Sequence, residues 1–479
     1  MNKFFVFLLA ILSWGNFLFA QEVTIKGNAP QYSGEELFFY YYSDRITMDE
    51  RQLTSCIVEN DGSFKTSFYI DEIMSLHIYL GVFQGFLYVE PDSTYEILLP
   101  PKQEKQKSQK LNPFFEYHQV YLKILNQPEN ELNEQIGRFD KHYAKYLSEN
   151  ALAIYAKRQL ANPDSFQAVI NDTFEKNKHP FFQQYKNYRL AYINHFAKER
   201  NPLKVFQKYY DSKPILHRNP AYMKLLGELC SKYLENAFKT PKGDELLNTL
   251  LKGDDIFSLK QQLSKATAIK SDTLLEIILL QTLYSGYYNK DFSRKTVLNN
   301  INLIKQYSTI TAHIDLAENI EHQISYLQNG TLAPPFELEN TKGKKVRLSD
   351  FRGKYVYLNF VTTDSYACKT DLELLKKLYQ KQKKIAEFVT VSVDEDFAET
   401  KKFIERNNYK WTFLKYTRSS DLLKKYRVYA YPVYYLIDPD GRLAMSPSVS
   451  PREDFELRFF EIWTAWKQQK RREEHQRKR

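Results

Sequence analysis

Few side chains in this 479-residue sequence stand where they could do chemistry. The best candidate is the thiol of Cys368, because an apolar strand-like run, Tyr355–Phe360, leads into a predicted helix that begins at this cysteine. No base accompanies it, since eight of the nine histidines precede residue 330 and the ninth, His475, lies near the C-terminus. No Cys/His pair has zinc spacing and no Gly-rich phosphate loop is present, so we expect no metal and no cofactor.

The other two cysteines have structural interpretations. Cys230 lies among leucines at helical spacing, which predicts a core position, and Cys56 lies in a predicted strand. The odd number of three leaves at least one thiol unpaired within the chain. A disulfide between any two of them would have to cross predicted domains.

The elements around Cys368 predict an α/β sheet. The strand before it is followed by a helix to about Lys381, a second strand at 388–394, a second helix at 398–407, a third strand at 433–437 and a closing helix at 452–468. Strands that alternate with helices of this length indicate α/β architecture.

The preceding sequence divides into two regions of different pattern. Short β-type runs separated by turn residues predict a small antiparallel β-sandwich over residues 21–101; the runs are 22–27, 36–42, 53–59, 63–70, 76–80, 86–90 and 95–99. Residues 102–328 are poor in glycine and show helical spacing, for example at Tyr222, Leu225, Leu226 and Leu229, with prolines as helix starts and breaks. This region predicts an all-α domain.

The first twenty residues and the charge distribution bear on location and partners. Residues 1–20 have a basic start, an apolar run too short to span a membrane and a polar break, which predicts a secretory signal peptide and export to the periplasm or cell envelope; an uncleaved membrane anchor is the alternative. The net charge is +10, and half of it belongs to Lys467–Arg479, which we interpret as a frayed, solvated tail. We therefore expect no nucleic-acid partner.

Several motifs in register make the C-terminal segment resemble the thioredoxin-like domain of the TlpA/ResA group of exported thiol-disulfide oxidoreductases and the related AhpC/TSA branch. They are Ala333-Pro334 with Phe336 and Leu338, Leu348 with Gly353-Lys354, Leu358-Asn359-Phe360, Cys368, Val391-Ser392-Val393-Asp394, and Tyr431-Pro432 ahead of Leu436 to Gly441. The predicted organisation is a signal peptide (1–20), a β-sandwich (21–101), a helical domain (102–328), a thioredoxin-like domain (329–468) and a basic tail (469–479).

The resemblance implies a Cys-x-x-Cys motif in which the first thiolate attacks a disulfide and the second cysteine resolves the mixed disulfide. Here these positions read Ser365-Tyr366-Ala367-Cys368, so the attacking thiol is a serine. A hydroxyl forms neither a thiolate nor a disulfide, and a two-cysteine cycle within this domain is therefore excluded.

The resemblance also implies a cis-proline at Pro432, next to the motif, which leaves the backbone of Tyr431 free to pair with an extended peptide. Asp371 matches an acidic family position that assists proton transfer; with half of the motif missing, we interpret it as a solvated helix carboxylate. Together with Tyr366, these residues form the candidate binding surface.

Three functional hypotheses remain open. The leading one is an exported family member without two-cysteine activity that binds a peptide or protein client at the cell envelope. The second is an oxidoreductase or a peroxidase-like enzyme that uses Cys368 as a single thiol, because Ser365-x-x-Cys368 can imitate the Thr-x-x-Cys of peroxiredoxins. The third is an interaction module built on the aromatic-rich helical region.

Overall fold

The computed structural model describes residues 20–110, 112, 114–126, 128, 131–151, 163–197, 199, 201–237, 241–252, 255–287, 293–417 and 421–477. The chain forms two compact units. We call Met1–Glu104 with Tyr117–Asn319 the N-terminal unit, and Lys105–Glu116 with Ile320–Arg479 the C-terminal unit. Apart from Ala20, the predicted signal peptide lies outside the described residues.

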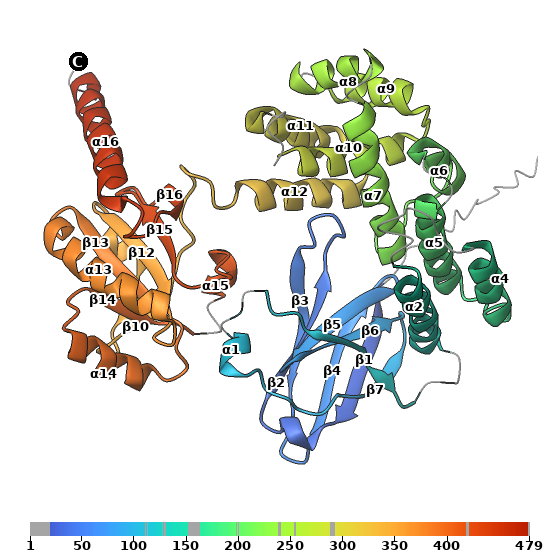
Figure 1. Cartoon of the computed structure of the whole chain (residues 1–479), viewed down its shortest axis with the longest axis horizontal. Coiled ribbons are helices and arrows are strands. Elements are labelled where there is room, and N and C mark those ends of the chain that lie inside the picture. The colour runs from blue at the N-terminus through green and yellow to red at the C-terminus, as the bar shows by residue number, and fades with distance from the viewer. Residues whose placement is uncertain are drawn as a thin grey trace, which may run out of the picture. The chain divides into compact units, whose positions relative to one another are not determined.

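The N-terminal unit begins with β-structure (Figure 1). The described strands are β1 (Gln21–Asn28), β2 (Glu36–Tyr42), β3 (Glu50–Ile57), β4 (Ser63–Ile70), β5 (Met74–Leu80), β6 (Phe83–Val89), β7 (Thr94–Leu98), β8 (His118–Tyr121) and β9 (Lys123–Ile124). They form a four-stranded sheet, β4-β1-β7-β9, and a five-stranded sheet, β3-β2-β5-β6-β8. Alternate side chains of both sheets, such as Val23 and Ile25 of β1 and Leu76 and Ile78 of β5, share one buried cluster.

Two details of this β-region differ from expectation. The β1–β7 and β6–β8 pairs are parallel, whereas the remaining pairs are antiparallel as expected. Moreover, β8 and β9 lie within residues 102–328, which we expected to be helical throughout. Their side chains are mostly exposed, so no apolar alternation marks them, and they are held to the sheets by backbone pairing.

Helices follow from Leu132 onward (Figure 1). The described helices of this part are α2 (Leu132–Glu149), α4 (Pro163–Thr173), α5 (Pro180–Ala197), α6 (Pro202–Tyr209), α7 (Pro220–Ala237), α8 (Pro241–Lys252), α9 (Ile256–Thr267), α10 (Asp272–Tyr287), α11 (Arg294–Tyr307) and α12 (Thr311–Ser325). Five of them begin at a proline, as the sequence predicts, because proline lacks the N–H that a first helical residue does not use. The predicted α7 face is buried at Tyr222, Leu225, Leu226 and Leu229.

The C-terminal unit has a mixed sheet in the order β11-β10-β14-β13-β12-β15-β16. Its strands are β10 (Glu337–Asn340), β11 (Lys345–Arg347), β12 (Tyr355–Val361), β13 (Ala386–Ser392), β14 (Thr412–Lys415), β15 (Val433–Ile437) and β16 (Leu443–Ser448). Its helices include α13 (Tyr366–Gln382), α14 (Phe397–Asn407), α15 (Leu422–Lys425) and α16 (Phe455–Arg477). The central strand β12 is parallel to β13 and antiparallel to β15, and all seven of its residues are buried. This is a thioredoxin-like arrangement.

The last helix is longer than expected. We predicted a closing helix to residue 468 and a frayed tail, but α16 continues to Arg477, and of this tail only residues 478 and 479 lie outside the described ranges. Side-chain pairs within the helix, such as Lys470 with Glu473, support this extension, and basic residues near a helix C-terminus interact favourably with the helix dipole. No helix in the described ranges is long and apolar enough to cross a membrane.

Candidate functional site

The loop before α13 is held in place by one carboxylate. Asp394, which follows β13, accepts hydrogen bonds from the Thr362 hydroxyl (2.7 Å), the Thr363 backbone N–H (2.9 Å) and the Ser392 hydroxyl (2.7 Å). Thr362 and Thr363 directly follow β12, and Ser392 is the last residue of β13, so Asp394 joins the ends of these two strands. The start of α13 therefore has a fixed position at the carboxyl edge of the two central strands.

Ser365 is the N-cap residue of α13. Its backbone is extended, with φ −88° and ψ 126°, and its Oγ accepts a hydrogen bond from the backbone N–H of Cys368 at 3.4 Å. This is the ordinary capping role of a serine. The hydroxyl at this position thus satisfies one of the unpaired N–H groups of the first turn, where the resemblance implies an attacking thiolate.

Cys368 lies inside the unit rather than at its surface. Its side chain is fully buried, at 0% exposure, in a cluster with Leu372 and Leu375 of the same helix, and the cysteine is free. Burial raises the pKa of the Cys368 thiol, and hydrogen bonds from Thr362 and Ser365 oppose this only in part. A neutral, enclosed thiol is a poor nucleophile.

The interpretation of Asp371 as a solvated carboxylate is wrong. Its side chain is buried, the Tyr434 hydroxyl donates to its Oδ2 at 2.9 Å, and the Arg452 Nε donates to its Oδ1. Arg452 also donates from Nη2 to the backbone carbonyl of Ala367 at 3.2 Å. A buried carboxylate needs such partners, but nothing local in the sequence identifies them because they lie far along the chain.

The Tyr431-Pro432 peptide bond is cis, as the resemblance implies. Tyr431 packs against the buried cluster that contains Cys368, which places it beside the motif, and burial raises the pKa of its phenol to about 12. Among the described residues, no backbone hydrogen bond is made by Tyr429, Ala430 or Tyr431. The structure therefore brings the motif and the proline segment together and leaves this backbone unpaired.

Tyrosines provide the exposed apolar surface near the motif. The Tyr366 side chain, in the first turn of α13, is 83% exposed, and that of Tyr429 is 70% exposed. The six predicted site residues thus differ in exposure. Tyr366 is on the surface, Cys368 and Asp371 are inside, and the other three are half-buried: Ser365, Tyr431 and Pro432.

The remaining cysteines are also held within their unit. Cys230 is buried in α7, and Cys56 is half-buried in β3 with its pKa raised by burial to about 11. All three cysteines are free. Within the described ranges, no group of three or more His, Cys, Asp or Glu side chains is placed to hold a metal ion.

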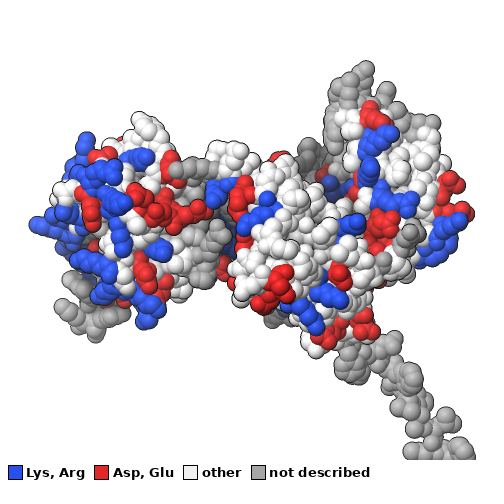
Figure 2. All heavy atoms as spheres, turned by 90° about the horizontal axis from the view of Figure 1, so that it is seen from below, with Lys and Arg blue, Asp and Glu red and all other residues white. Residues whose placement is uncertain are grey.

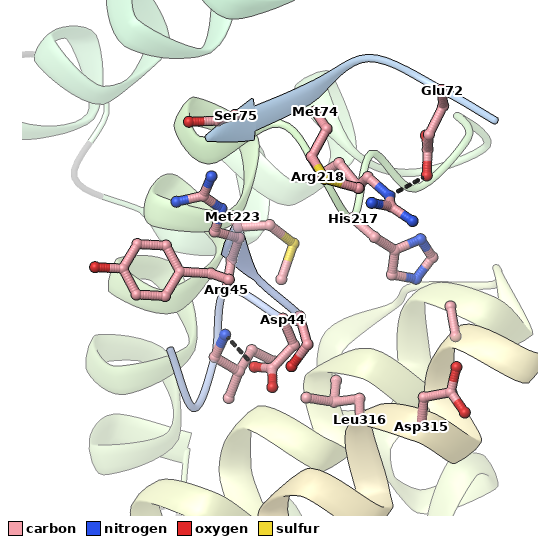
Figure 3. A pocket seen from close by; sticks show the side chains of 14 residues that line it. Asp44, Arg45, Glu72, Met74, Ser75, His217, Arg218, Met223, Asp315 and Leu316 are labelled. Carbon is pink, nitrogen blue, oxygen red and sulfur yellow. Dashed lines mark hydrogen bonds and ion pairs between the residues drawn. The ribbon is translucent and has the colours of Figure 1, made fainter. Parts of the chain in front are cut away.

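A cavity of about 160 Å³ lies in the N-terminal unit, between the loops that flank β2 and β5 and the helices α7 and α12 (Figure 3). Two of its charged groups already have partners, since Arg218 pairs with Glu72 at 2.5 Å and Asp44 accepts from the Ile46 N–H at 2.8 Å. Burial lowers the pKa of His217, on its wall, to about 4. The cavity holds no arrangement of nucleophile, base and acid that we recognise as catalytic.

Comparison with known proteins agrees with the geometry of the C-terminal unit. Residues 329–446 match the AhpC/TSA family. The thiol-disulfide oxidoreductase ResA of Bacillus thuringiensis subsp. konkukian is 32% identical over 118 residues, which are 24% of this chain and 68% of that protein. The chain belongs to the ResA-like family of thiol-disulfide oxidoreductases. ResA of Geobacillus kaustophilus is 37% identical over 116 residues, covering 24% of this chain and 66% of that protein.

Solved structures of similar proteins also cover a part of this chain. The crystal structure of the thioredoxin domain of a thiol-disulfide oxidoreductase from Bacteroides vulgatus is 27% identical and covers 28% of this chain and 99% of that chain, with a TM-score of 0.26. The solution structure of a thiol:disulfide interchange protein from Bacteroides sp. is 29% identical and covers 26% of this chain and 85% of that chain, with a TM-score of 0.25. The ResA-like matches leave most of the N-terminal unit uncovered.

Proposed function

We propose that this chain is a ResA-like protein whose thioredoxin-like domain does not run a two-cysteine redox cycle and instead binds an extended peptide segment of a client. The observation that carries this proposal is Ser365 at the N-cap of α13, with Cys368 enclosed behind it. Reduction of a disulfide by a dithiol site needs two sulfurs: one attacks and releases a substrate thiolate, and the other displaces the second. This site supplies one sulfur.

The backbone at Tyr429–Tyr431 supports the binding part of the proposal. Its N–H and C=O groups have no backbone partners among the described residues, so an extended peptide can pair with them as an added strand. The exposed ring of Tyr366, in the first turn of α13, offers apolar contact area to a client. None of these contacts requires a reactive thiol.

Binding can be measured with an array of unstructured decapeptides and the purified full chain. We expect some of the peptides to bind, and we expect Tyr366→Ala to weaken their binding at least fivefold. Tyr69→Ala is the matched control, because Tyr69 of β4 is 66% exposed and lies in the other unit. Equal losses in both variants, or no binding to any peptide, would reject the peptide-binding role.

The alternative is an enzyme that uses Cys368 as a single thiol, as in a peroxidase or a mixed-disulfide partner. Its burial and raised pKa argue against this function. Alkylation of the folded protein at pH 7 to 8, read by mass spectrometry of its peptides, tests the point. We expect Cys368 to remain unlabelled until denaturant is added; rapid labelling of Cys368 in the folded chain would favour the alternative.

Export is also part of the proposal and is supported by the apolar leader that precedes β1. Expression in a Gram-negative host followed by fractionation and intact-mass analysis provides the test. We expect a periplasmic or envelope-associated product that begins at Gln21. A cytoplasmic chain that retains Met1 would contradict export.

A further inference from the structure

Helix α16 has an apolar surface that the C-terminal unit does not cover. One side of the helix is packed against the unit, with Phe455 and Phe459 fully buried. On another side, Leu457 and Phe460 are 63% and 58% exposed. Phe460 also contacts the half-buried Trp463, with ring centroids 5.7 Å apart. This side of α16 thus carries exposed apolar side chains that nothing in the described residues covers.

Basic residues continue the same surface toward the C-terminus. Spacings of three and four residues place Leu457, Phe460, Thr464, Lys467 and Arg471 on one helix face. Lys467 and Arg471 are exposed, and the Lys467 ammonium lies 4.7 Å from the centre of the Trp463 ring. One face therefore presents apolar side chains first and cations about two to three turns later.

The charge of this end is unusual for the molecule. Residues 467–479 contain seven Lys or Arg and two Glu, which is half of the net charge of +10. On the face of the molecule shown in Figure 2, by contrast, acidic and basic side chains are interspersed. A partner of α16 should therefore be anionic and should also accept apolar side chains.

We propose that this face of α16, which we call the α16 face and define by Leu457, Phe460, Lys467 and Arg471, binds the surface of an anionic phospholipid bilayer. Leu and Phe side chains enter the boundary between headgroups and acyl chains, while Lys and Arg pair with lipid phosphates. The helix lies in the plane of the interface. The proposal does not depend on the motif at Ser365 or on the peptide-binding role.

Two other partners fit only part of this surface. A polyanion such as a nucleic acid pairs with Lys467 and Arg471 but offers no apolar surface to bury Leu457 and Phe460. A second copy of the chain covers the apolar side chains but brings the basic ends of two helices together, unless the helices are antiparallel. The anionic lipid surface satisfies both features at once.

The test is sedimentation of the full chain with large vesicles at low and high salt. Vesicles of phosphatidylcholine with one third phosphatidylglycerol are compared with vesicles of phosphatidylcholine alone. We expect binding to the anionic vesicles at least tenfold tighter than to the neutral ones, and a loss of most of this difference as salt rises from 0.1 to 0.5 M. Equal binding to both vesicle types, or no binding to the anionic ones, overturns the proposal.

Variants separate the α16 face from every other source of binding, including the N-terminal leader. Leu457→Ser with Phe460→Ser, and Lys467→Gln with Arg471→Gln, should each weaken anionic-vesicle binding at least fivefold. Phe257→Ser is the apolar control, because Phe257 of α9 is 66% exposed in the other unit, and Lys141→Gln with Lys145→Gln of α2 is the charge control. Unchanged melting temperatures verify folding.

The competing partners give distinct results. If the chain binds polyphosphate tightly and the Leu457→Ser, Phe460→Ser variant retains full binding to vesicles and to polyphosphate, the surface is a polyanion site and the proposal fails. If sedimentation equilibrium shows a dimer that the same variant dissociates, and vesicles do not bind, the face is an interface between copies and the proposal also fails.

Discussion

Ser365 shows what a single residue decides in this domain. Its predicted position at the start of a helix is confirmed by its N-cap role, although α13 begins at Tyr366, two residues before the expected start. The absence of a dithiol site could be predicted, because it depends only on the residue type at position 365. The sequence left open whether Cys368 is a buried, inert residue or an exposed thiol, and the structure places it inside. The partners of Asp371 could not be predicted, because the fold brings Arg452 and Tyr434 from distant positions.

Loss of the Ser365 cap should have a measurable effect on stability. Ser365→Ala should lower the free energy of unfolding by about 0.5–1 kcal/mol, because one backbone N–H of the first turn loses its partner. Ser365→Asn retains an acceptor and should be close to neutral. Urea denaturation measures both. A larger loss for the Asn variant than for the Ala variant would show that the hydroxyl does not act as a cap.

At the scale of elements, the buried Asp371 carboxylate connects α13 to β15 through Tyr434 and to the segment before α16 through Arg452. In a redox-active relative we would expect an acid at this position to be available for proton transfer. Here both carboxylate oxygens have partners. The group therefore acts as a structural connection between three parts of the sheet and its helices.

Removal of one of these partners should destabilise the C-terminal unit. Tyr434→Phe keeps the ring but leaves one Asp371 oxygen without its donor, so we expect a loss of about 1–2 kcal/mol in the free energy of unfolding. Tyr366→Phe is the control, because the Tyr366 ring is exposed, and it should be neutral. Equal effects of the two substitutions would refute the structural role of Asp371.

The elements themselves were predictable where apolar residues alternate or repeat. Strands β2, β4 and β15 have the predicted bounds, because their flanking turn residues are distinct. Strands β8 and β9 were missed, since they are short, mostly exposed and defined by backbone pairing. The extension of α16 was missed because a basic, polar sequence is compatible both with a helix and with a frayed tail.

At the scale of the whole molecule, the two units have separate buried clusters, so each should unfold with its own pH dependence. The N-terminal unit contains a buried carboxylate, Glu276 of α10. Burial alone would raise the pKa of Glu276, but hydrogen bonds from His313, Ser308 and Lys260 outweigh it and lower the pKa to about 2.

This network predicts the acid sensitivity of the N-terminal unit. Because the pKa of Glu276 is lower in the folded chain than its usual value near 4.5, its contribution to stability is complete above pH 4.5 and is lost as the pH falls toward 2. Glu276→Gln should lower the free energy of unfolding at pH 7 and make it depend less on pH between 4.5 and 2. Urea denaturation followed by circular dichroism at each pH measures this free energy. An unchanged dependence on pH in the variant would contradict the assignment.

The central claim is that the thioredoxin-like domain lacks one sulfur and cannot complete a dithiol exchange. The most direct measurement is insulin reduction with a reducing partner, in wild type, Cys368→Ser and Ser365→Cys. Our account predicts that wild type and Cys368→Ser are indistinguishable from background, and that Ser365→Cys reduces insulin above background. In that variant the new thiol attacks an insulin disulfide and releases one insulin thiol, Cys368 then displaces the other, and the reducing partner re-reduces the intramolecular disulfide that is left. Robust turnover by wild type that Cys368→Ser abolishes would contradict it.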